Sequence, residues 1–452
     1  MLPKRFPDRD EIAAVRAEAD LVEPGSTDES KTFRLAGRVL ARREMGKITF
    51  LDLVDRSGRI QLLAGKVDID LGDIVGVSGH PAKSRRGEPS LQVVELELLG
   101  KIRAPLPDTF HGLTDVEARY RKRYLDLLMN DETRADFLLR SRIVAAIRRR
   151  LDADGFVEVE TPVLQPRYGG AFAEPFVTHW NHLDQDFYLR IATELYLKRL
   201  IVGGLERVYE LGKDFRNEGV SYKHSNEFTM VEWYEAYADY RDTMARMEEL
   251  IATVAQEVNG TTKVTFRGHE VDLGSWRRLK LVDVLEAEGL WTRGVDELRS
   301  RLEARDVDTR HDKTWAQLVD HALERLVEPS LIEPTILYDY PIEVSPFART
   351  TEGDPTIVER FEYFVGGMEL GNAFSELNDS EEQAARFAMQ ESEREAGAGE
   401  AEPGDPDYVE ALSYGMPPTG GLGLGIDRLA MVLAGRDTIR DVVLFPALRE
   451  RT

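Results

Sequence analysis

Two extended runs joined by a polar loop constrain this chain more than any other feature of its sequence. RVYELGKDFR and EFTMVEWYEAY are rich in β-branched and aromatic residues, and the loop between them contains Gly219, which can adopt the positive φ of a turn. Residues 207–240 are therefore predicted to form a β-hairpin. Arginine, glutamates, a histidine and aromatic residues gather at its loop end, and this mixture suits a small charged ligand.

Five short segments with a period of two lie between residues 31 and 103. They are FRLAGRVLARR, KITFLDLVD, GRIQLL, DIVGVSG and SLQVVELELL, and turn residues separate them. Five strands in about 70 residues predict a small OB-type barrel, a frequent binder of single-stranded nucleic acid. The region has 14 basic and 9 acidic residues although the net charge of the chain is −23, so it is the part best suited to a polyanion.

Three residues of this barrel suit recognition of an unpaired base. Phe50 can stack on the base, while the side chains of Arg38 and Gln61 can read its edge. The alternative is that Phe50 belongs to the barrel core and that Arg38 and Gln61 are solvated.

The remainder of the chain predicts an α+β body with an antiparallel sheet. A short amphipathic helix is expected near residues 10–22, a long helix over residues 131–151, and a strand in GFVEVETPVLQP. Residues 241–330 are mostly helical in pattern, with a hairpin in TKVTFRGHEVDL, and the acidic segment 391–407 is expected to be a solvated excursion. The expected domains are an extension (1–30), the barrel (31–103), a linker (104–130) and the α+β body (131–452).

Composition excludes several classes of protein. The chain of 452 residues has no cysteine, which removes disulfides, thiolate chemistry and cysteine-based zinc sites. No run approaches the roughly 18 apolar residues of a membrane span, and the first 20 residues lack the apolar core of a signal peptide. A cytoplasmic protein is therefore expected.

The glycine-rich motifs exclude two common nucleotide-binding loops. No Gly-Lys pair is followed by Ser or Thr, so a Walker A loop is missing, and Gly421, Gly423 and Gly425 have GxGxG rather than GxGxxG spacing. The helix after Gly425 can still approach a phosphate, and Arg428 lies one turn into it. The alternative for Arg428 is a surface salt bridge.

Two carboxylates suggest a metal site in FEYFVGGMEL. Glu362 and Glu369 are seven residues apart, and a turn at Gly366-Gly367 would bring them together. Paired carboxylates beside a triphosphate suit Mg²⁺, although two exposed glutamates remain the alternative. The pair His179 and His182 has no further ligand pattern, so zinc is not expected there.

These motifs together resemble those of the class II lysyl-tRNA synthetases, and the likeness covers about residues 31–452. GFVEVETPVLQP is similar to motif 1 (about 143–166), the hairpin 207–240 to motif 2, and GLGLGIDR to motif 3 (about 420–446). RIATELYLKRL and MELGNAFSELND are similar to the lysine-specific branch. The resemblance implies a catalytic sheet of six to seven antiparallel strands, a homodimer formed partly through motif 1 with Pro162 at its boundary, and ATP and Mg²⁺ chemistry that charges tRNA(Lys) with L-lysine.

The resemblance also implies a role for individual residues. The α-phosphate would be held by Arg216 and the γ-phosphate by Arg428 and His224, while Phe228 would stack on adenine and Glu218 would lie near its amino group. Mg²⁺ would be held by Glu362 and Glu369. Lysine would be bound by Gly170, Glu194, Glu232, Tyr234, Asn372, Phe374 and Glu376, and the anticodon by Arg38, Phe50 and Gln61. The acids at the lysine positions favour a basic substrate by charge alone.

Two alternatives to a tRNA-charging enzyme stay open. In the first, a synthetase-like paralogue delivers activated lysine to another acceptor or pathway. In the second, the chain is a catalytically idle nucleic-acid-binding protein. The joint presence of Arg216, Glu362, Glu369 and Arg428 argues against an idle site.

Overall fold

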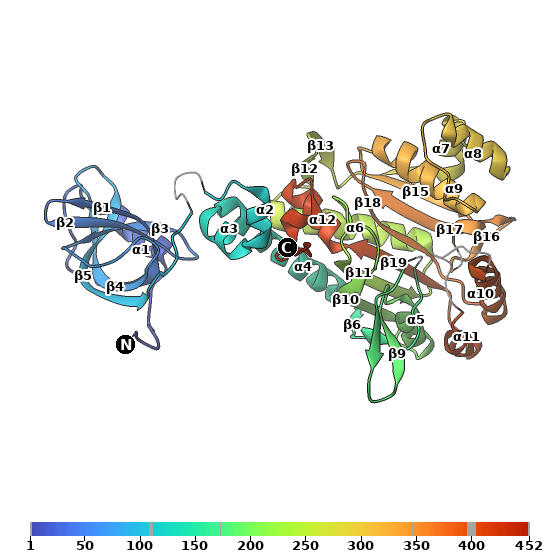
Figure 1. Cartoon of the computed structure of the whole chain (residues 1–452), viewed down its shortest axis with the longest axis horizontal. Coiled ribbons are helices and arrows are strands. Elements are labelled where there is room, and N and C mark those ends of the chain that lie inside the picture. Colours follow the sequence, from blue (N-terminus) through green and yellow to red (C-terminus); the bar gives the residue numbers. More distant parts are fainter. Residues whose placement is uncertain (1, 108–111, 172, 346, 396–403, 451–452) are drawn as a thin grey trace. The chain divides into compact units, whose positions relative to one another are not determined.

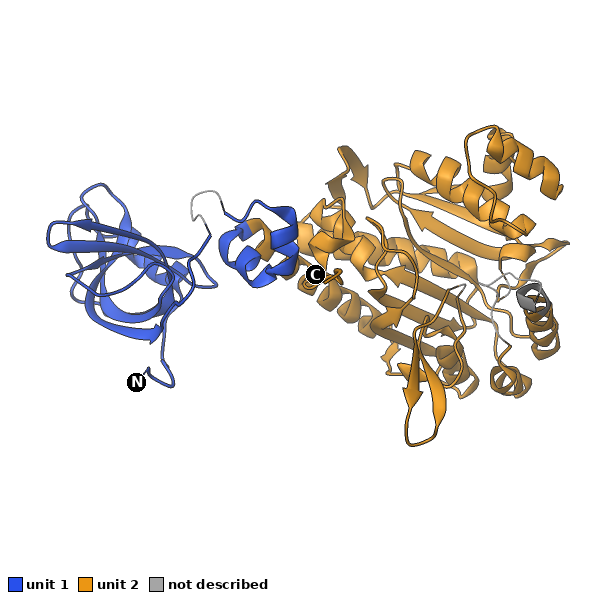
Figure 2. Cartoon of the chain, viewed as in Figure 1, with its two compact units in different colours: residues 1–131 blue, residues 132–452 orange. Residues whose placement is uncertain are grey.

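The structure is a computed structural model that describes residues 2–107, 112–171, 173–345, 347–395 and 404–450. The chain divides into two compact units, Met1–Asp131 and Glu132–Thr452 (Figure 2). Each unit has its own hydrophobic core. The middle of the acidic segment 391–407 lies outside the described residues.

The first unit contains a closed five-stranded barrel, which confirms the predicted OB-type domain (Figure 1). Its strands follow the order β1-β2-β3-β5-β4, and Leu35, Leu51 and Ile60 are among the residues that fill its core. The predicted linker region contains two short helices. The elements of this unit are α1 (Ile12–Asp20), β1 (Phe33–Met45), β2 (Ile48–Val54), β3 (Arg59–Ala64), β4 (Ile74–Lys83), β5 (Pro89–Gly100), α2 (Val116–Arg121) and α3 (Arg123–Met129).

The second unit is built on a nine-stranded sheet in the order β14-β15-β17-β18-β19-β11-β10-β6, with β16 paired to β17. The α+β prediction is confirmed, but the sheet is larger than expected and is mixed. Two short end strands, β6 and β14, pair in parallel with their neighbours. The strands are β6 (Val157–Glu158), β10 (Arg207–Phe215), β11 (Glu227–Ala236), β14 (Arg277–Lys280), β15 (Thr335–Pro341), β16 (Thr350–Thr351), β17 (Asp354–Phe364), β18 (Glu369–Ser375) and β19 (Thr419–Gly425).

Helices and small sheets surround this central sheet (Figure 1). The helices are α4 (Asp131–Ala153), α5 (Glu194–Val202), α6 (Tyr240–Asn259), α7 (Leu281–Ala287), α8 (Val295–Glu303), α9 (Trp315–Ala322), α10 (Ser380–Glu395), α11 (Pro406–Ser413), α12 (Ile426–Ala434) and α13 (Ile439–Val442), with short helical turns at η1 (Leu323–Val327), η2 (Glu328–Ser330) and η3 (Ile342–Val344). The small sheets contain β7 (Leu164–Gln165), β8 (Val177–Trp180) and β9 (Gln185–Leu189), and β12 (Lys263–Phe266) and β13 (His269–Asp272).

The prediction of one strand in GFVEVETPVLQP is wrong. The segment forms two short strands, β6 and β7, which belong to different sheets. Between them Thr161 donates hydrogen bonds from its backbone N and its Oγ to Glu210 Oε2, at 3.0 and 2.6 Å. Pro162 follows and has no backbone donor, so the ladder of β6 cannot continue through it.

The predicted hairpin 207–240 is confirmed, and its returning strand separates two environments. In β11, Val231 and Trp233 point into the main core, which is shared with helices α4, α6 and α12. Alternate residues of a strand face opposite sides. Met230 and Glu232 therefore lie on the other face, where they line a pocket.

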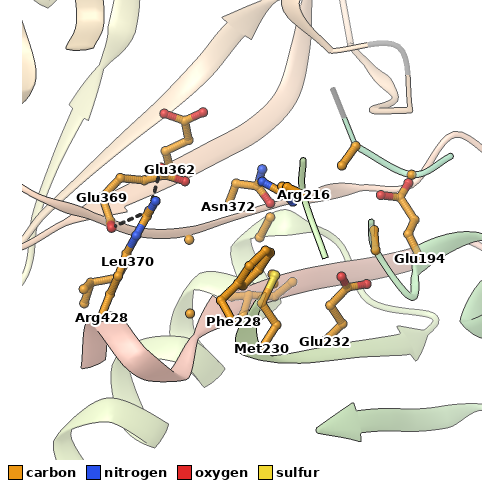
Figure 3. A pocket seen from close by; sticks show the side chains of 18 of the residues that line it. Glu194, Arg216, Phe228, Met230, Glu232, Glu362, Glu369, Leu370, Asn372 and Arg428 are labelled. Atoms are coloured by element: carbon orange, nitrogen blue, oxygen red, sulfur yellow. Dashed lines mark hydrogen bonds and ion pairs between the residues drawn. The ribbon is translucent and has the colours of Figure 1, made fainter. Parts of the chain in front are cut away.

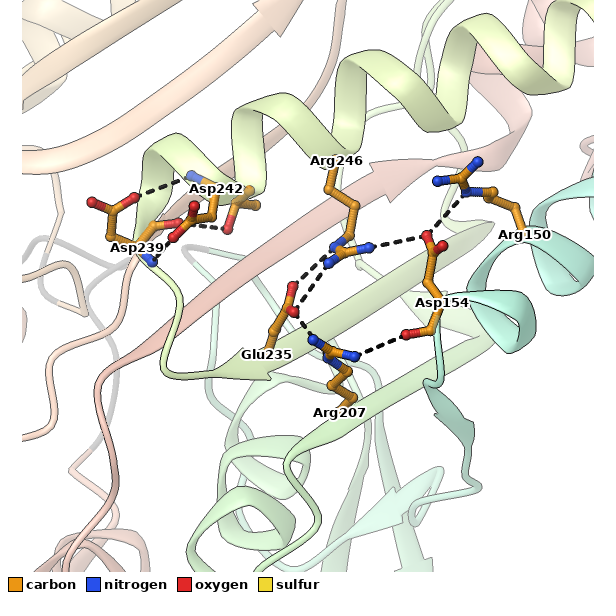
Figure 4. A network of polar contacts seen from close by, with 8 residues as sticks. Arg150, Asp154, Arg207, Glu235, Asp239, Asp242 and Arg246 are labelled. Carbon is orange, nitrogen blue, oxygen red and sulfur yellow. Dashed lines mark hydrogen bonds and ion pairs between the residues drawn. The ribbon is translucent and has the colours of Figure 1, made fainter.

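An ion network fixes one edge of this hairpin to the helices beside it (Figure 4). Arg246 of α6 donates to Glu235 of β11 at 2.9 and 3.0 Å and to Asp154 at 3.0 Å. Arg207 of β10 donates to Glu235 at 2.9 Å and to the carbonyl of Asp154 at 3.1 Å. The Glu235 side chain is 9% exposed, so its charge depends on these partners.

Replacing Arg246 with alanine is expected to destabilise the second unit by about 2 to 3 kcal/mol, because it leaves the buried Glu235 and Asp154 with fewer cations. The unfolding midpoint in a thermal melt is expected to fall by several degrees. Arg149→Ala is the control, because Arg149 is 59% exposed in its pair with Glu257 and such pairs contribute less than about 1 kcal/mol. Equal shifts in the two variants would contradict a stabilising network.

Candidate functional site

A pocket of about 380 Å³ opens on the face of the sheet opposite the main core. The predicted site residues of the second unit, fourteen in all, line this pocket. Figure 3 shows Glu362, Glu369 and Arg428 at one end, Glu194 and Glu232 at the other, and Phe228 and Met230 between them. Strands β11, β17, β18 and β19 and the loop of the hairpin supply most of its wall.

The predicted turn at Gly366-Gly367 is present and brings the two carboxylates of FEYFVGGMEL to one end of the pocket. Both glycines have positive φ, +60° and +69°, and Val365 and Met368 exchange backbone hydrogen bonds across them. Positive φ at both central positions is the geometry of a two-residue type I′ hairpin. Glu369 pairs with Phe364, and Glu362 pairs with Asn372 two steps further along the ladder.

Cations hold each of these carboxylates. Glu362 accepts hydrogen bonds from Arg360 at 2.6 Å and from the Tyr340 hydroxyl at 2.9 Å, and Glu369 accepts from Arg428 at 2.9 Å. Burial raises the pKa of Glu362. Burial also opposes the charge of Glu369, but Arg428 and then Lys223 outweigh it and hold the pKa of Glu369 below its ordinary value.

The carboxylate pair fits Mg²⁺ that is also bound by phosphate. Mg²⁺ prefers one or two carboxylates together with phosphate oxygens and water. Among the described residues no group of three acidic or histidine side chains is placed to hold a metal by itself. Of the two histidines of HWNH, His179 contacts Asp186 Oδ1 at 2.8 Å.

Arg428 and His224 lie at one corner of the pocket next to the carboxylates, and Arg428 supplies the positive charge of this cationic corner. Arg428, one turn into α12, donates to the backbone carbonyls of Lys223 at 3.3 Å and Glu369 at 2.9 Å. His224 Nδ1 lies 2.8 Å from Ser221 Oγ, and burial, Arg428 and Lys223 lower the pKa of His224 to about 4. The imidazole is therefore neutral at pH 7 and can donate a hydrogen bond without adding a charge.

Arg216 and Phe228 occupy the middle of the pocket. The guanidinium carbon of Arg216 lies 5.1 Å from the ring centroid of Phe228. Asn226 donates from its side chain to the carbonyls of Arg216 at 2.9 Å and Glu218 at 2.6 Å, and the Arg216 backbone N donates to the Asn226 carbonyl at 2.9 Å. These contacts order the hairpin loop, so Arg216 is presented from a fixed backbone.

Three buried carboxylates form the other end of the pocket. Glu194, Glu232 and Glu376 are 5%, 5% and 1% exposed. Burial is the largest cause that raises the pKa of each, and for Glu232, where Asp214 and Glu194 add repulsion, the pKa rises to about 8. A cationic ligand stabilises such a cluster most, because a nearby positive charge favours the ionised carboxylates that burial disfavours.

Two glycines leave room for a ligand beside these acids. A Cβ on Gly421 would lie 1.9 Å from Glu376 Oε1 and 2.5 Å from Tyr234 Cε1. A Cβ on Gly170, where φ is +89°, would lie 3.0 Å from Glu194 Cβ. Asn372 and Phe374 line the same part of the pocket from β18.

Sequence reasoning missed three cations that pair with acids in the pocket or beside it. Lys223 donates to Glu328 at 2.6 Å, Arg360 donates to Glu362, and Lys198 contacts Glu194 and Glu376. Two of them had a local signal. Arg360 lies two residues before Glu362 on one strand face, and Lys198 lies four residues after Glu194 on one helix face.

The three predicted barrel residues lie on adjacent strands of the first unit. Arg38 of β1 pairs with Val54, and Gln61 of β3 pairs with Asp52, both on β2. Phe50, Asp52 and Val54 alternate with the core residues Leu51 and Leu53, so these strands carry all three predicted residues on the outer face of the barrel. The alternative that Phe50 belongs to the barrel core is therefore wrong.

The alternative for Arg38 and Gln61 was that their side chains are solvated. In the structure both side chains are at least partly buried and hydrogen-bonded. Gln61 is 9% exposed and accepts a hydrogen bond from Ser90 Oγ at 3.2 Å. Arg38 donates to the carbonyl of Gly72 at 2.7 Å.

Across the part of the chain that is described, no helix is long and apolar enough to span a membrane.

An OB-type barrel precedes a body whose pocket combines arginines with paired carboxylates, and this combination suits an enzyme that joins nucleotide chemistry to a nucleic acid. Comparison with known families agrees. Residues 115–449 match the tRNA synthetases class II (D, K and N), and residues 33–99 match the OB-fold nucleic acid binding domain. The chain therefore belongs to the class II tRNA synthetases of the D, K and N type.

Individual relatives are similar over nearly the whole chain. A lysine–tRNA ligase of Carboxydothermus hydrogenoformans is 48% identical and covers 93% of this chain and 90% of its own length. The corresponding enzymes of Shouchella clausii and Bacillus subtilis are 49% and 47% identical. They cover 92% and 97% of this chain, and 86% and 91% of their own lengths.

Proposed function

We propose that the protein is a lysine–tRNA ligase that uses ATP to activate L-lysine and then charges tRNA(Lys). The observation that carries this proposal is the buried trio Glu194, Glu232 and Glu376, which suits a cationic amino acid, at the opposite end of one pocket from the cationic corner of Arg428. The full-length similarity to lysine–tRNA ligases supports the same assignment.

In the first step, the lysine carboxylate attacks the α-phosphorus of ATP, and pyrophosphate leaves as the bond to the β-phosphate breaks. We assign Arg216 to the α-phosphate, where it neutralises the charge that grows during attack, and Arg428 and neutral His224 to the γ-phosphate. Phe228 stacks on adenine, and Glu218 receives its amino group. Such a site accelerates the reaction mainly by aligning the reactants and stabilising charge.

Mg²⁺, held by Glu362 and Glu369, would neutralise the phosphates when ATP is bound. Arg360 keeps Glu362 in place, and Arg428 does the same for Glu369. In the second step, a terminal adenosine hydroxyl of the tRNA attacks the lysyl carbonyl, and AMP leaves.

Lysine recognition is assigned to the acidic end of the pocket. Glu376 and Tyr234 receive the side-chain ammonium together with Glu232, and Glu194 and the backbone at Gly170 receive the α-ammonium. Asn372 and Phe374 form the wall beside them. An acidic amino acid would be repelled here, because three carboxylates line this end.

Lysine-dependent ATP–pyrophosphate exchange, followed by charging of an unfractionated tRNA pool, tests the proposed function. Exchange with lysine and charging of tRNA are the expected results. Exchange without charging would favour the alternative in which activated lysine goes to another acceptor, and no exchange would favour an idle nucleic-acid-binding protein.

We further propose that Phe50 stacks on an anticodon base, with Arg38 and Gln61 beside it. Replacing Phe50 with alanine is expected to lower kcat/KM for tRNA charging by about tenfold or more, since one base stack contributes about 1 to 3 kcal/mol. Pyrophosphate exchange should not change. Val94→Ala is the control, because Val94 is an exposed apolar residue on β5 of the same barrel. An equal loss of charging and exchange in Phe50→Ala would contradict an anticodon role.

The enzyme is proposed to be a cytoplasmic homodimer. Exposed apolar side chains gather on and near the short strands β6 to β9, of which β6 and β7 lie within motif 1, and a second copy would cover them. They are Val157, Val163, Leu164, Val177, Trp180 and Leu183. Sedimentation equilibrium is expected to give twice the mass of the 51.2 kDa chain. The sequence without cysteine suits a reducing compartment.

A further inference from the structure

A lysine side chain of the protein lies directly behind the acidic end of the pocket. Lys198 of α5 is 0% exposed and does not line the pocket, whereas both of its carboxylate partners do. Its Nζ donates to Glu194 Oε1 at 2.5 Å and forms an ion pair with Glu376 Oε2. One fixed cation therefore bridges two of the three acids from the protein side of the wall.

Aromatic rings complete the surroundings of this ammonium. Its Nζ lies 5.0, 5.5 and 5.9 Å from the ring centroids of Phe347, Phe374 and Tyr234. Faces of aromatic rings attract cations, and the effect grows when the cation is desolvated. Rings and carboxylates thus keep Lys198 charged although it is fully buried, and its pKa lies above the ordinary lysine value because Glu194 and Glu376 outweigh burial.

Glu376 is only partly satisfied by this contact. Oε2 pairs with the Lys198 ammonium, but Oε1 accepts no hydrogen bond from a described residue, although the carboxylate is 1% exposed and lines the pocket. A buried carboxylate oxygen without a donor is costly, and a ligand that brings a donor recovers that cost. Burial raises the pKa of Glu376, Glu194 and Glu232 add repulsion, and Lys198 is the cation that opposes these effects.

We propose that Lys198 is a positioning residue that sets the spacing and the charge of Glu194 and Glu376, so that the acidic end of the pocket accepts a primary ammonium. This inference rests on the proposed function. When all three carboxylates are ionised, they and Lys198 together carry a net charge of −2, which is opposite to the +2 of the two ammonium groups of free lysine. The groups that face Lys198 and titrate are Glu194, Glu376, Tyr234 and Tyr408.

The test compares Lys198→Met, which keeps an unbranched side chain one heavy atom shorter but removes its charge, with the wild-type protein. At pH 7 the KM for lysine in pyrophosphate exchange is expected to rise at least tenfold, while the KM for ATP stays within about twofold. Without the cation, Glu194 and Glu376 retain protons to higher pH, and a protonated acid does not attract an ammonium. The ratio of variant to wild-type KM for lysine is therefore expected to fall between pH 7 and pH 9.

A ligand with a neutral side chain separates loss of charge from loss of shape. 6-Hydroxynorleucine has a hydroxyl in place of the side-chain ammonium of lysine but keeps the α-ammonium, and its inhibition constant against lysine is expected to rise by a smaller factor than the KM for lysine in Lys198→Met. Lys198→Arg, which keeps the positive charge, should preserve the preference for lysine over this analogue. Lys198→Gln replaces the methionine variant if Lys198→Met does not fold.

Three results would overturn the inference. The first is an unchanged KM for lysine in Lys198→Met. The second is an equal weakening of lysine, 6-hydroxynorleucine and ATP at every pH, which a purely structural role would produce. The third is a wild-type protein that does not exchange pyrophosphate with lysine, which would also overturn the proposed function, whereas the first two leave the function standing.

Discussion

Replacing Arg216 with alanine is expected to reduce lysine-dependent pyrophosphate exchange by at least about a thousandfold. The guanidinium lies in the middle of the pocket, 5.1 Å from the Phe228 ring, between the carboxylate pair and the acidic trio. Removing a single preorganised donor to a developing negative charge typically costs a hundred- to thousandfold in rate, and here a full positive charge is removed as well.

Lys213→Ala is the matched control for this variant. Lys213 lies on the same strand β10, is 39% exposed beside Glu227, and does not line the pocket. The rate of pyrophosphate exchange by Lys213→Ala is expected to stay within twofold of wild type. Wild-type exchange in Arg216→Ala would refute the assignment to the α-phosphate.

Replacing Gly421 with alanine is expected to raise the KM for lysine by about ten- to a hundredfold, with little change in the KM for ATP. The added Cβ would lie 1.9 Å from Glu376 Oε1, so the carboxylate and the Tyr234 ring must both move. Overpacking of this kind costs about 1 to 3 kcal/mol, and every 1.4 kcal/mol is tenfold in affinity.

The control for Gly421 lies on the same strand. In Gly425→Ala the nearest contact of the added Cβ is the Leu370 carbonyl oxygen at 3.3 Å, so the KM for lysine should not change. If both variants raise the KM for lysine equally, the effect comes from strand β19 as a whole rather than from the acidic end of the pocket.

Parts of the fold could be predicted wherever the sequence has a regular local pattern of residue types. Five period-two segments predicted the barrel, and the β-branched and aromatic residues of RVYELGKDFR and EFTMVEWYEAY predicted the hairpin. The turn at Gly366-Gly367 could be predicted because two adjacent glycines suit positive φ at both positions. The segment GFVEVETPVLQP was misread because its composition resembles one strand, while Pro162 and the contact of Thr161 with Glu210 divide it.

The motifs predicted which residues lie in the pocket. They did not predict the ion pairs and hydrogen bonds that these residues form with the rest of the protein. Lys223 and Glu328 are 105 residues apart, and their contact depends on how the hairpin loop meets the end of the helical insertion. Tyr340 reaches Glu362 in the same way, from a neighbouring strand. Contacts of this kind arise from tertiary packing, and no spacing along the chain encodes them.

The two faces of strand β11 have a consequence for how enzymes of this architecture can diversify. Val231 and Trp233 support the core, whereas Met230, Glu232 and Tyr234 contact the pocket. A substitution at a pocket position changes what the enzyme selects without opening a cavity in the main core, because the two sets of side chains lie on opposite sides of one backbone. Substrate choice can therefore be altered along one short stretch of sequence while the main core keeps its packing.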